Sequence, residues 1–158
     1  MTGINTVARP KGFKSIALAG VFSNTLFLAV IYPGLIYLQY KNPDEIAILR
    51  IMSLFSWFIY LPLTVILLVG SIGLLFKQYW SRSLCLWALT ADIILGVCYI
   101  VIDNSVRIAN WNNDTIFSLA SIPIYILIYI LEGGVIYYLN RKRVDQYLDK
   151  CRFNANGS

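Results

Sequence analysis

The strongest constraint on this chain is a set of four long, unbroken apolar runs. They cover residues 15–40, 51–76, 83–102 and 115–139, and the segments between them hold nearly all the charge. A helix needs about 20 apolar residues to cross a hydrocarbon core of about 30 Å. Of the 158 residues, 58% are hydrophobic and 13% are charged, which agrees with this interpretation. The sequence therefore predicts an integral membrane protein with four spans.

The spans should be helices rather than strands, because each run is at least twice the roughly 10 residues of a barrel strand and none alternates polar with apolar residues. The short connection at residues 77–82 makes the second and third helices antiparallel neighbours. We expect an all-α, antiparallel bundle of four transmembrane helices that forms a single membrane domain over residues 1–158. The basic tail, residues 140–158, should continue the fourth helix for a few turns before it frays.

Lysine and arginine indicate the orientation of the spans. Ten of the 13 basic residues fall in the N-terminal segment, the second connection and the tail, and three fall in the other two connections. Cytoplasmic segments of membrane proteins carry this excess, so both termini should be cytoplasmic. The net charge of +5 reflects this asymmetry, and we expect no nucleic-acid partner. The basic tail could also contact anionic lipid.

Residue types that are absent or badly placed exclude most catalytic chemistry. The chain has no histidine, which removes histidine-ligated metals and a histidine general base. Cys85 and Cys98 lie 13 residues apart on one helix, on roughly opposite faces, and cannot pair with each other. No nucleophile, metal set or phosphate-binding loop accompanies the carboxylates. We therefore expect no enzyme, no catalytic residue, no metal site and no cofactor.

Each predicted helix has one polar or small face. On the third helix this stripe is Asp92, Gly96 and Tyr99, and on the fourth it is Tyr125, Tyr129 and Glu132. The spacings of three and four place each set on one side of its helix. We expect these two stripes to face each other across the bundle, with Leu127, Ile130 and Leu131 turned toward lipid or a partner.

Depth in the membrane sharpens this expectation. Counted from the cytoplasmic ends, four polar residues lie about eight to twelve residues inside and could meet in one layer near the midplane; they are Asn24, Thr64, Asp92 and Glu132. A charged side chain there costs at least ~2.5 kcal/mol, so such residues normally face a bundle interior. Since no lysine or arginine lies at this depth, we expect at least one of the two carboxyls to be protonated near neutral pH.

Three roles for this layer remain open. The polar residues could be hydrogen-bonding contacts between helices, a site for a ligand, cation or proton, or partners for a basic residue of another subunit. The candidate ligand-binding or proton-binding residues are Asn24, Thr64, Asp92, Tyr99, Tyr125, Tyr129 and Glu132. At the outer mouth, Asp103, Arg107 and Asp114 should form a solvated group of ion pairs.

Two stretches resemble a widespread group of small bacterial four-helix membrane proteins, mostly of unknown function. They are RPKGF at residues 9–13, which runs directly into the first span, and GLLFKQYWSRSLCLWAL at residues 73–89, across the turn between spans two and three. The resemblance covers the layout of the whole chain and about twenty residues by motif. It implies a bacterial inner membrane and carries over no activity.

Taken together, these features favour a small non-enzymatic inner-membrane protein that acts as an accessory or interaction subunit, including an immunity protein against a membrane toxin. The alternative is a small proton-coupled or cation-coupled transporter or channel that works as an oligomer. Besides the lipid bilayer, its partners would be another membrane protein or further copies of itself. A lipid or small molecule could also bind within the bundle.

Overall fold

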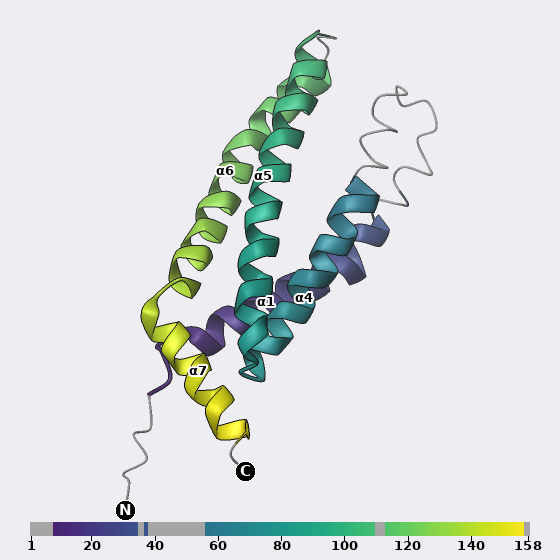
Figure 1. Cartoon of the computed structure of the whole chain (residues 1–158). Helices are drawn as coiled ribbons and strands as arrows, with labels where there is room; N and C mark the ends of the chain where they lie inside the picture. Colours follow the sequence, from purple (N-terminus) through teal and green to yellow (C-terminus); the bar gives the residue numbers. More distant parts are fainter. Residues whose placement is uncertain (1–7, 35–36, 38–55, 110–112, 157–158) are drawn as a thin grey trace, which may run out of the picture.

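A computed structural model describes residues 8–34, 37, 56–109 and 113–156 (Figure 1). These residues form α-helices and two short π-helical turns, and none of them lies in a strand. In chain order the elements are α1 (Phe13–Leu26), η1 (Phe27–Ile31), η2 (Ser56–Tyr60), α4 (Leu61–Leu75), α5 (Tyr79–Ala109), α6 (Asn113–Leu139) and α7 (Lys142–Asn156).

Four helical segments are long and apolar enough to cross a membrane. They are Phe13–Gly34, Phe58–Leu75, Tyr79–Ile102 and Ile122–Leu139, and each overlaps one of the four predicted runs. Within the described residues, the prediction of four helices long and apolar enough to cross a membrane is therefore confirmed in number and approximate position. Residues 35–36 and 38–55 lie outside the described residues; they include the end of the first predicted run, the first connection and the start of the second run.

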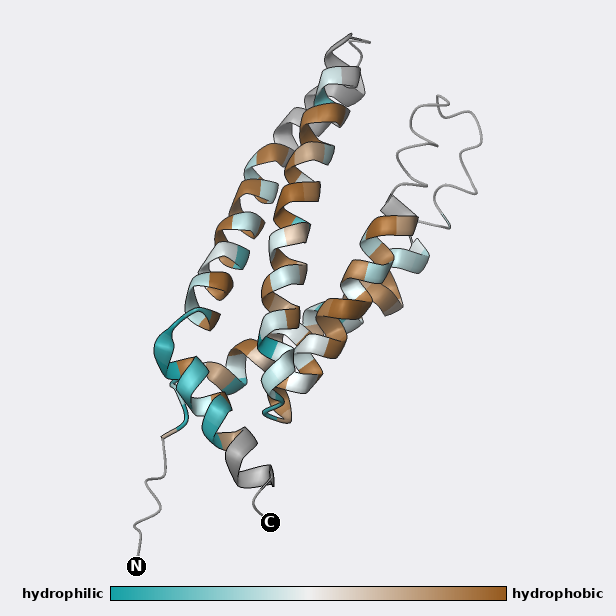
Figure 2. Cartoon of the chain, in the orientation of Figure 1, coloured by the Kyte–Doolittle hydropathy of each residue, from teal (hydrophilic) through white to brown (hydrophobic). Residues whose placement is uncertain are grey.

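The helices are arranged as two pairs that share one end. Along the chain α1 packs against α4, α4 against α5, and α5 against α6. Figure 1 shows the α1–α4 pair and the α5–α6 pair diverging with increasing distance from α7. Apolar residues follow the spans, and hydrophilic residues gather where α6 meets α7 (Figure 2). We call the end that carries α7 the base.

Two helix distortions occur next to prolines. The turn η1 ends two residues before Pro33, and η2 ends two residues before Pro62. Proline has no backbone N–H, and its ring clashes with the carbonyl four residues earlier, so the preceding turn widens. Single π-helical turns inside helices are found frequently at functional sites. The second of these turns ends at Tyr60.

Small residues let neighbouring spans approach closely in the basal half. A side chain added at Gly20 of α1 would meet the Ser71 hydroxyl of α4, and one added at Gly70 would meet Cys85 Sγ of α5 at 2.6 Å. Close approach of this kind is how membrane helices gain packing energy where lipid removes the hydrophobic driving force. The interhelical contacts of α4 therefore depend on having no side chain at these positions.

The expectation that the tail continues the fourth helix is wrong. The fourth span ends at Leu139, and after a turn at Asn140 and Arg141 the chain forms the separate helix α7. Val144 and Leu148, one turn apart on α7, are fully buried against Phe13 and Leu139. The apolar spacing of α7 thus gives it one face to bury against the spans.

Arg82 of α5 connects α5 to this turn through two hydrogen bonds. Its Nε donates to the Leu139 carbonyl at 2.7 Å, and its Nη1 donates to Asp145 Oδ1 at 2.5 Å. The last carbonyls of a helix lack partners within the helix, so Arg82 satisfies one at the end of α6 while it pairs with the first turn of α7. The sequence pattern gave this arginine only a role in orientation.

We predict that Gly70→Ala lowers the thermal stability of the purified protein in detergent. Forcing a methyl group against Cys85 Sγ should cost about 1–3 kcal/mol, the usual range for overpacking. Cys85→Ala in the same chain removes that sulfur and should restore most of the loss. Gly133→Ala is the matched control, because apart from the adjacent residues and the helix's own backbone no atom lies within 4 Å of a side chain added there. Equal melting temperatures for the Gly70→Ala and Gly133→Ala variants would contradict the close packing.

Candidate functional site

The candidate site is a pair of carboxyl groups on two neighbouring spans. Asp92 on α5 and Glu132 on α6 are connected by a hydrogen bond between their side chains. A carboxylate has only acceptor oxygens, so a hydrogen bond between two carboxyls requires that one of them carries a proton. The contact between the two carboxyls is therefore favourable only when one of them carries a proton. The sequence-based expectation that the two stripes face each other is confirmed at this point.

The environment of the pair supplies no positive charge from the spans. The apolar segments 15–34, 58–75, 83–102 and 122–139 contain no lysine or arginine. Two unit charges of equal sign 4 Å apart repel by about 4 kcal/mol at an effective dielectric constant of 20. Both carboxyls cannot be ionised together at this depth without a cation between them. The proton is thus the simplest group that keeps α5 and α6 in contact here.

One oxygen atom of the two carboxyls makes no hydrogen bond with the described residues. Glu132 Oε2 is buried and has no hydrogen-bond partner among the described residues. Leaving a buried polar atom unpaired costs about 1–3 kcal/mol. A carboxyl kept at such a cost is more easily explained by a binding role than by helix packing alone. Glu132 Oε2 is accordingly the atom that a further proton, cation or polar ligand would contact.

Tyr129 forms the next contact between α5 and α6. Its hydroxyl occupies the space that a side chain at Gly96 would fill, so a larger residue at this position of α5 would require the Tyr129 side chain to move. Tyr129 also interacts electrostatically with both carboxyls. The glycine in the predicted stripe is therefore explained by the phenol that lies against it. Tyr129 stands next to the pair, where its hydroxyl can accept or donate a proton.

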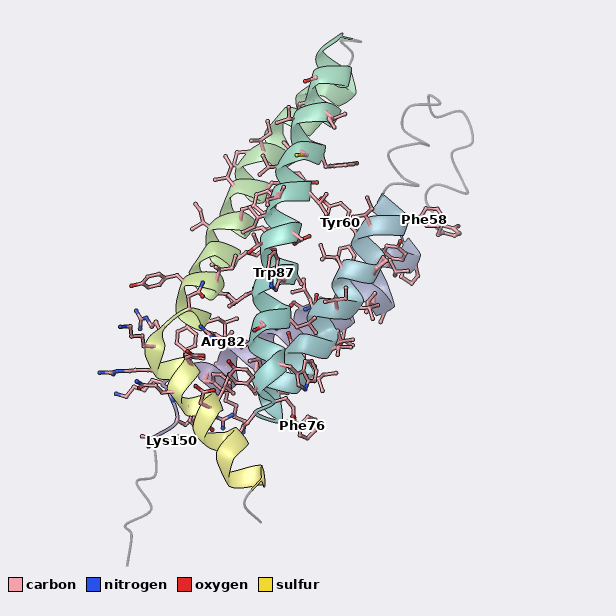
Figure 3. All side chains as sticks on the ribbon, viewed as in Figure 1. Phe58, Tyr60, Phe76, Arg82, Trp87 and Lys150 are labelled. Atoms are coloured by element: carbon pink, nitrogen blue, oxygen red, sulfur yellow. The ribbon has the colours of Figure 1, made fainter. Side chains whose placement is uncertain are left out.

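Tyr60 brings a third span to the site. Its ring meets the Tyr99 ring of α5 edge to face, with centroids 6.4 Å apart. It also interacts electrostatically with Asp92, Tyr129 and Tyr125. Figure 3 shows Tyr60 reaching from the α4 side toward α5. Sequence reasoning did not include Tyr60 among the candidate residues. Its position, one turn before Thr64, was the signal that could have included it.

Two other candidates use their polar groups inside their own helices. Asn24 Nδ2 donates to the Gly20 carbonyl at 2.7 Å, and Thr64 Oγ1 donates to the Tyr60 carbonyl at 2.8 Å. These i−4 contacts satisfy the side chains locally. The structure therefore assigns Asn24 and Thr64 local hydrogen bonds and brings the two carboxyls together with four tyrosines, which are Tyr60, Tyr99, Tyr125 and Tyr129.

The rest of the predicted residues are placed as follows. Leu127, Ile130 and Leu131 are exposed, as expected, with Ile130 exposing 65% of its surface. Cys85 is buried, Cys98 is exposed, and both are free thiols. The predicted group at the outer mouth consists of Asp103, Arg107 and Asp114. The side chains of these three residues lie outside the described part of the structure.

Comparisons with known proteins found no match. No protein family, curated protein or solved structure matches the chain. Within the described residues, no group of three or more histidine, cysteine, aspartate or glutamate side chains is placed to hold a metal ion. The fold and the site define a helical protein with four segments long and apolar enough to cross a membrane and a partly buried pair of carboxyls between two of them.

We predict that the thermal stability of the protein falls as the pH is raised far enough to remove the shared proton. Below that pH the pair is hydrogen-bonded and stabilises the α5–α6 contact; above it, two negative charges repel each other. The double variant Asp92→Asn with Glu132→Gln keeps a hydrogen bond without an ionisable proton and should lose this part of the pH dependence. Melting curves in detergent between neutral and alkaline pH measure the effect.

The matched control is Asp149→Asn, which removes a carboxyl of α7 outside the spans. This variant should keep the pH response of the unmodified protein. A double variant whose melting temperature depends on pH as strongly as that of the unmodified protein would show that the pair does not share a proton.

Proposed function

We propose that this protein binds and releases a proton at the Asp92–Glu132 pair and functions as a small proton-coupled membrane transporter. The observation that supports this most directly is the hydrogen bond between two carboxyls from different spans. Because this bond requires a proton, loss of the proton changes the interaction between α5 and α6 from attraction to repulsion. Proton binding is in this way coupled to the packing of two membrane helices.

The tyrosines around the pair fit the same role. Tyr60 and Tyr129 approach the carboxyls from two different spans. Their hydroxyls can pass on a proton, or supply oxygen ligands to a monovalent cation that replaces it. Intramembrane carboxyls in such surroundings generally mark ion or proton pathways. A non-enzymatic protein remains part of this proposal.

The test is proton movement into liposomes that contain the purified protein and a trapped pH-sensitive dye. Under an imposed membrane potential, the unmodified protein should acidify the lumen faster than protein-free liposomes do. Glu132→Gln keeps the size and hydrogen bonding of the side chain but cannot release a proton, so it should insert normally and lose the flux. Asp149→Asn should retain it. Flux through Glu132→Gln equal to that of the unmodified protein would remove the carboxyl pair from the pathway.

An accessory or interaction subunit is the second candidate function, and the exposure of Tyr125 favours it. This side chain lies within a span and exposes 38% of its surface, and its neighbours Leu127, Ile130 and Leu131 on α6 are exposed as well. A second copy or another membrane protein would cover this side of α6. Native mass spectrometry in mild detergent distinguishes a complex or an oligomer from a monomer.

We further propose a bacterial inner membrane and an antiparallel bundle with both termini in the cytoplasm. The placement of ten of the 13 basic residues supports this orientation. The resemblance of residues 9–13 and 73–89 to small bacterial membrane proteins supports the location. The base would then lie at the cytoplasmic surface.

Cysteine labelling gives a direct prediction for this topology. In a chain whose three native cysteines are replaced by alanine, single cysteines at Asn5 and Asn156 should be protected from an impermeant reagent in intact cells. A cysteine at Asn112 should react, because it lies in the connection with the fewer basic residues. Labelling of Asn5 or Asn156 from outside would reverse the proposed orientation.

A further inference from the structure

The base brings together basic residues from two segments that are distant in sequence, residues 9–14 and 141–143. The Tyr138 hydroxyl of α6 donates to the Lys11 carbonyl at 2.7 Å. The Phe13 ring of α1 packs against the Tyr147 ring of α7, with centroids 5.5 Å apart. These two contacts hold the N-terminal segment beside the end of α6 and the start of α7.

Six exposed basic residues surround this junction, and we call them the basal basic patch. They are Arg9, Lys11, Lys14, Arg141, Lys142 and Arg143. Figure 3 shows nitrogen-tipped side chains gathered where α6 meets α7. The nearby carboxyl of Asp145 is already paired with Arg82, and Arg82 is not part of the patch. The positive charge of the patch therefore has no neutralising partner in Asp145.

Aromatic rings fix the depth of two of these residues. The Arg141 guanidinium lies over the Tyr137 ring, 5.2 Å from its centroid, and that of Arg9 lies over the Phe13 ring at 5.6 Å. Tyr137 belongs to the last turn of a spanning helix and is 67% exposed. Tyrosines in that position lie at the level of the lipid headgroups. The guanidinium stacked on Tyr137 is consequently held at the same level.

We propose that the basal basic patch binds the phosphate groups of anionic phospholipids in the adjacent leaflet. Arginine presents its donors as a planar fork that matches a phosphate group, and the rings keep two such forks in place. The position at the end of the spans gives lipid headgroups direct access to the patch. A bound headgroup would connect the N-terminal segment, α6 and α7, and so stabilise the base independently of the carboxyl pair.

The experiment is native mass spectrometry of the full chain purified from mixed micelles that contain phosphatidylglycerol and phosphatidylcholine in equal amounts. The unmodified protein should retain phosphatidylglycerol in preference. Arg9→Gln with Arg141→Gln should reduce that preference by up to about fivefold for each residue changed, the effect of one basic residue near an anionic surface. Melting temperature with added phosphatidylglycerol should rise for the unmodified protein and rise less for this variant.

The charge-matched control is Lys77→Asn with Lys150→Gln, which removes two exposed lysines outside the patch. This control should lose less of the preference than the arginine variant. If the arginine variant does not fold, Lys11→Gln with Lys142→Gln removes two patch charges that make no ring contact among the described residues, and it should lose more of the preference than the control. Equal losses in patch and control variants would show that only net charge matters and would overturn the proposal.

A final arm separates lipid from free anion. Inorganic phosphate at millimolar concentration should neither raise the melting temperature as phosphatidylglycerol does nor displace the lipid. Stabilisation by phosphate alone would assign the patch to a soluble anion and overturn the proposal, as would retention of an acidic protein with no preference for anionic lipid.

Discussion

The arrangement of the spans depends on one apolar core at the base, to which all five α-helices described here contribute. Phe13 of α1, Leu74 of α4 and Cys85 of α5 are buried there together with Leu139 of α6 and Leu148 of α7. Lipid offers apolar side chains an environment as favourable as another helix does, so spans associate through close packing and polar contacts instead. The basal core provides close packing. The close contacts at Gly20 and Gly70 add to this packing, and the two hydrogen bonds of Arg82 add polar contacts.

Away from this core the α1–α4 pair and the α5–α6 pair diverge. In this region the Asp92–Glu132 contact connects α5 with α6, and the ring contact between Tyr60 of η2 and Tyr99 of α5 connects the second span with the third. A structure fixed at one end and held by a titratable contact farther along can change its helix packing when a proton leaves. Such a two-state element is what coupling between ion binding and conformation requires. This is the physical basis on which we favour a proton-coupled function.

Sequence periodicity was sufficient to predict four spans and the facing of Asp92 and Glu132, because both follow from helix geometry and the cost of charge in lipid. It could not tell that Thr64 bonds to its own helix, since a hydroxyl at that depth can serve either a neighbouring span or the carbonyl one turn back. It also missed α7. Val144 and Leu148 are one turn apart within a charged tail, and only the contacts at the base show that this short pattern is buried.

The central claim, that Asp92 and Glu132 share a proton, is tested most directly by infrared spectroscopy of the purified protein at neutral pH. We expect a carbonyl band of a protonated, hydrogen-bonded carboxylic acid that shifts in heavy water and disappears in both the Glu132→Gln and the Asp92→Asn variants. A spectrum in which neither substitution affects a protonated-acid band, while both remove carboxylate absorption, would show that the two groups are ionised and would contradict the account.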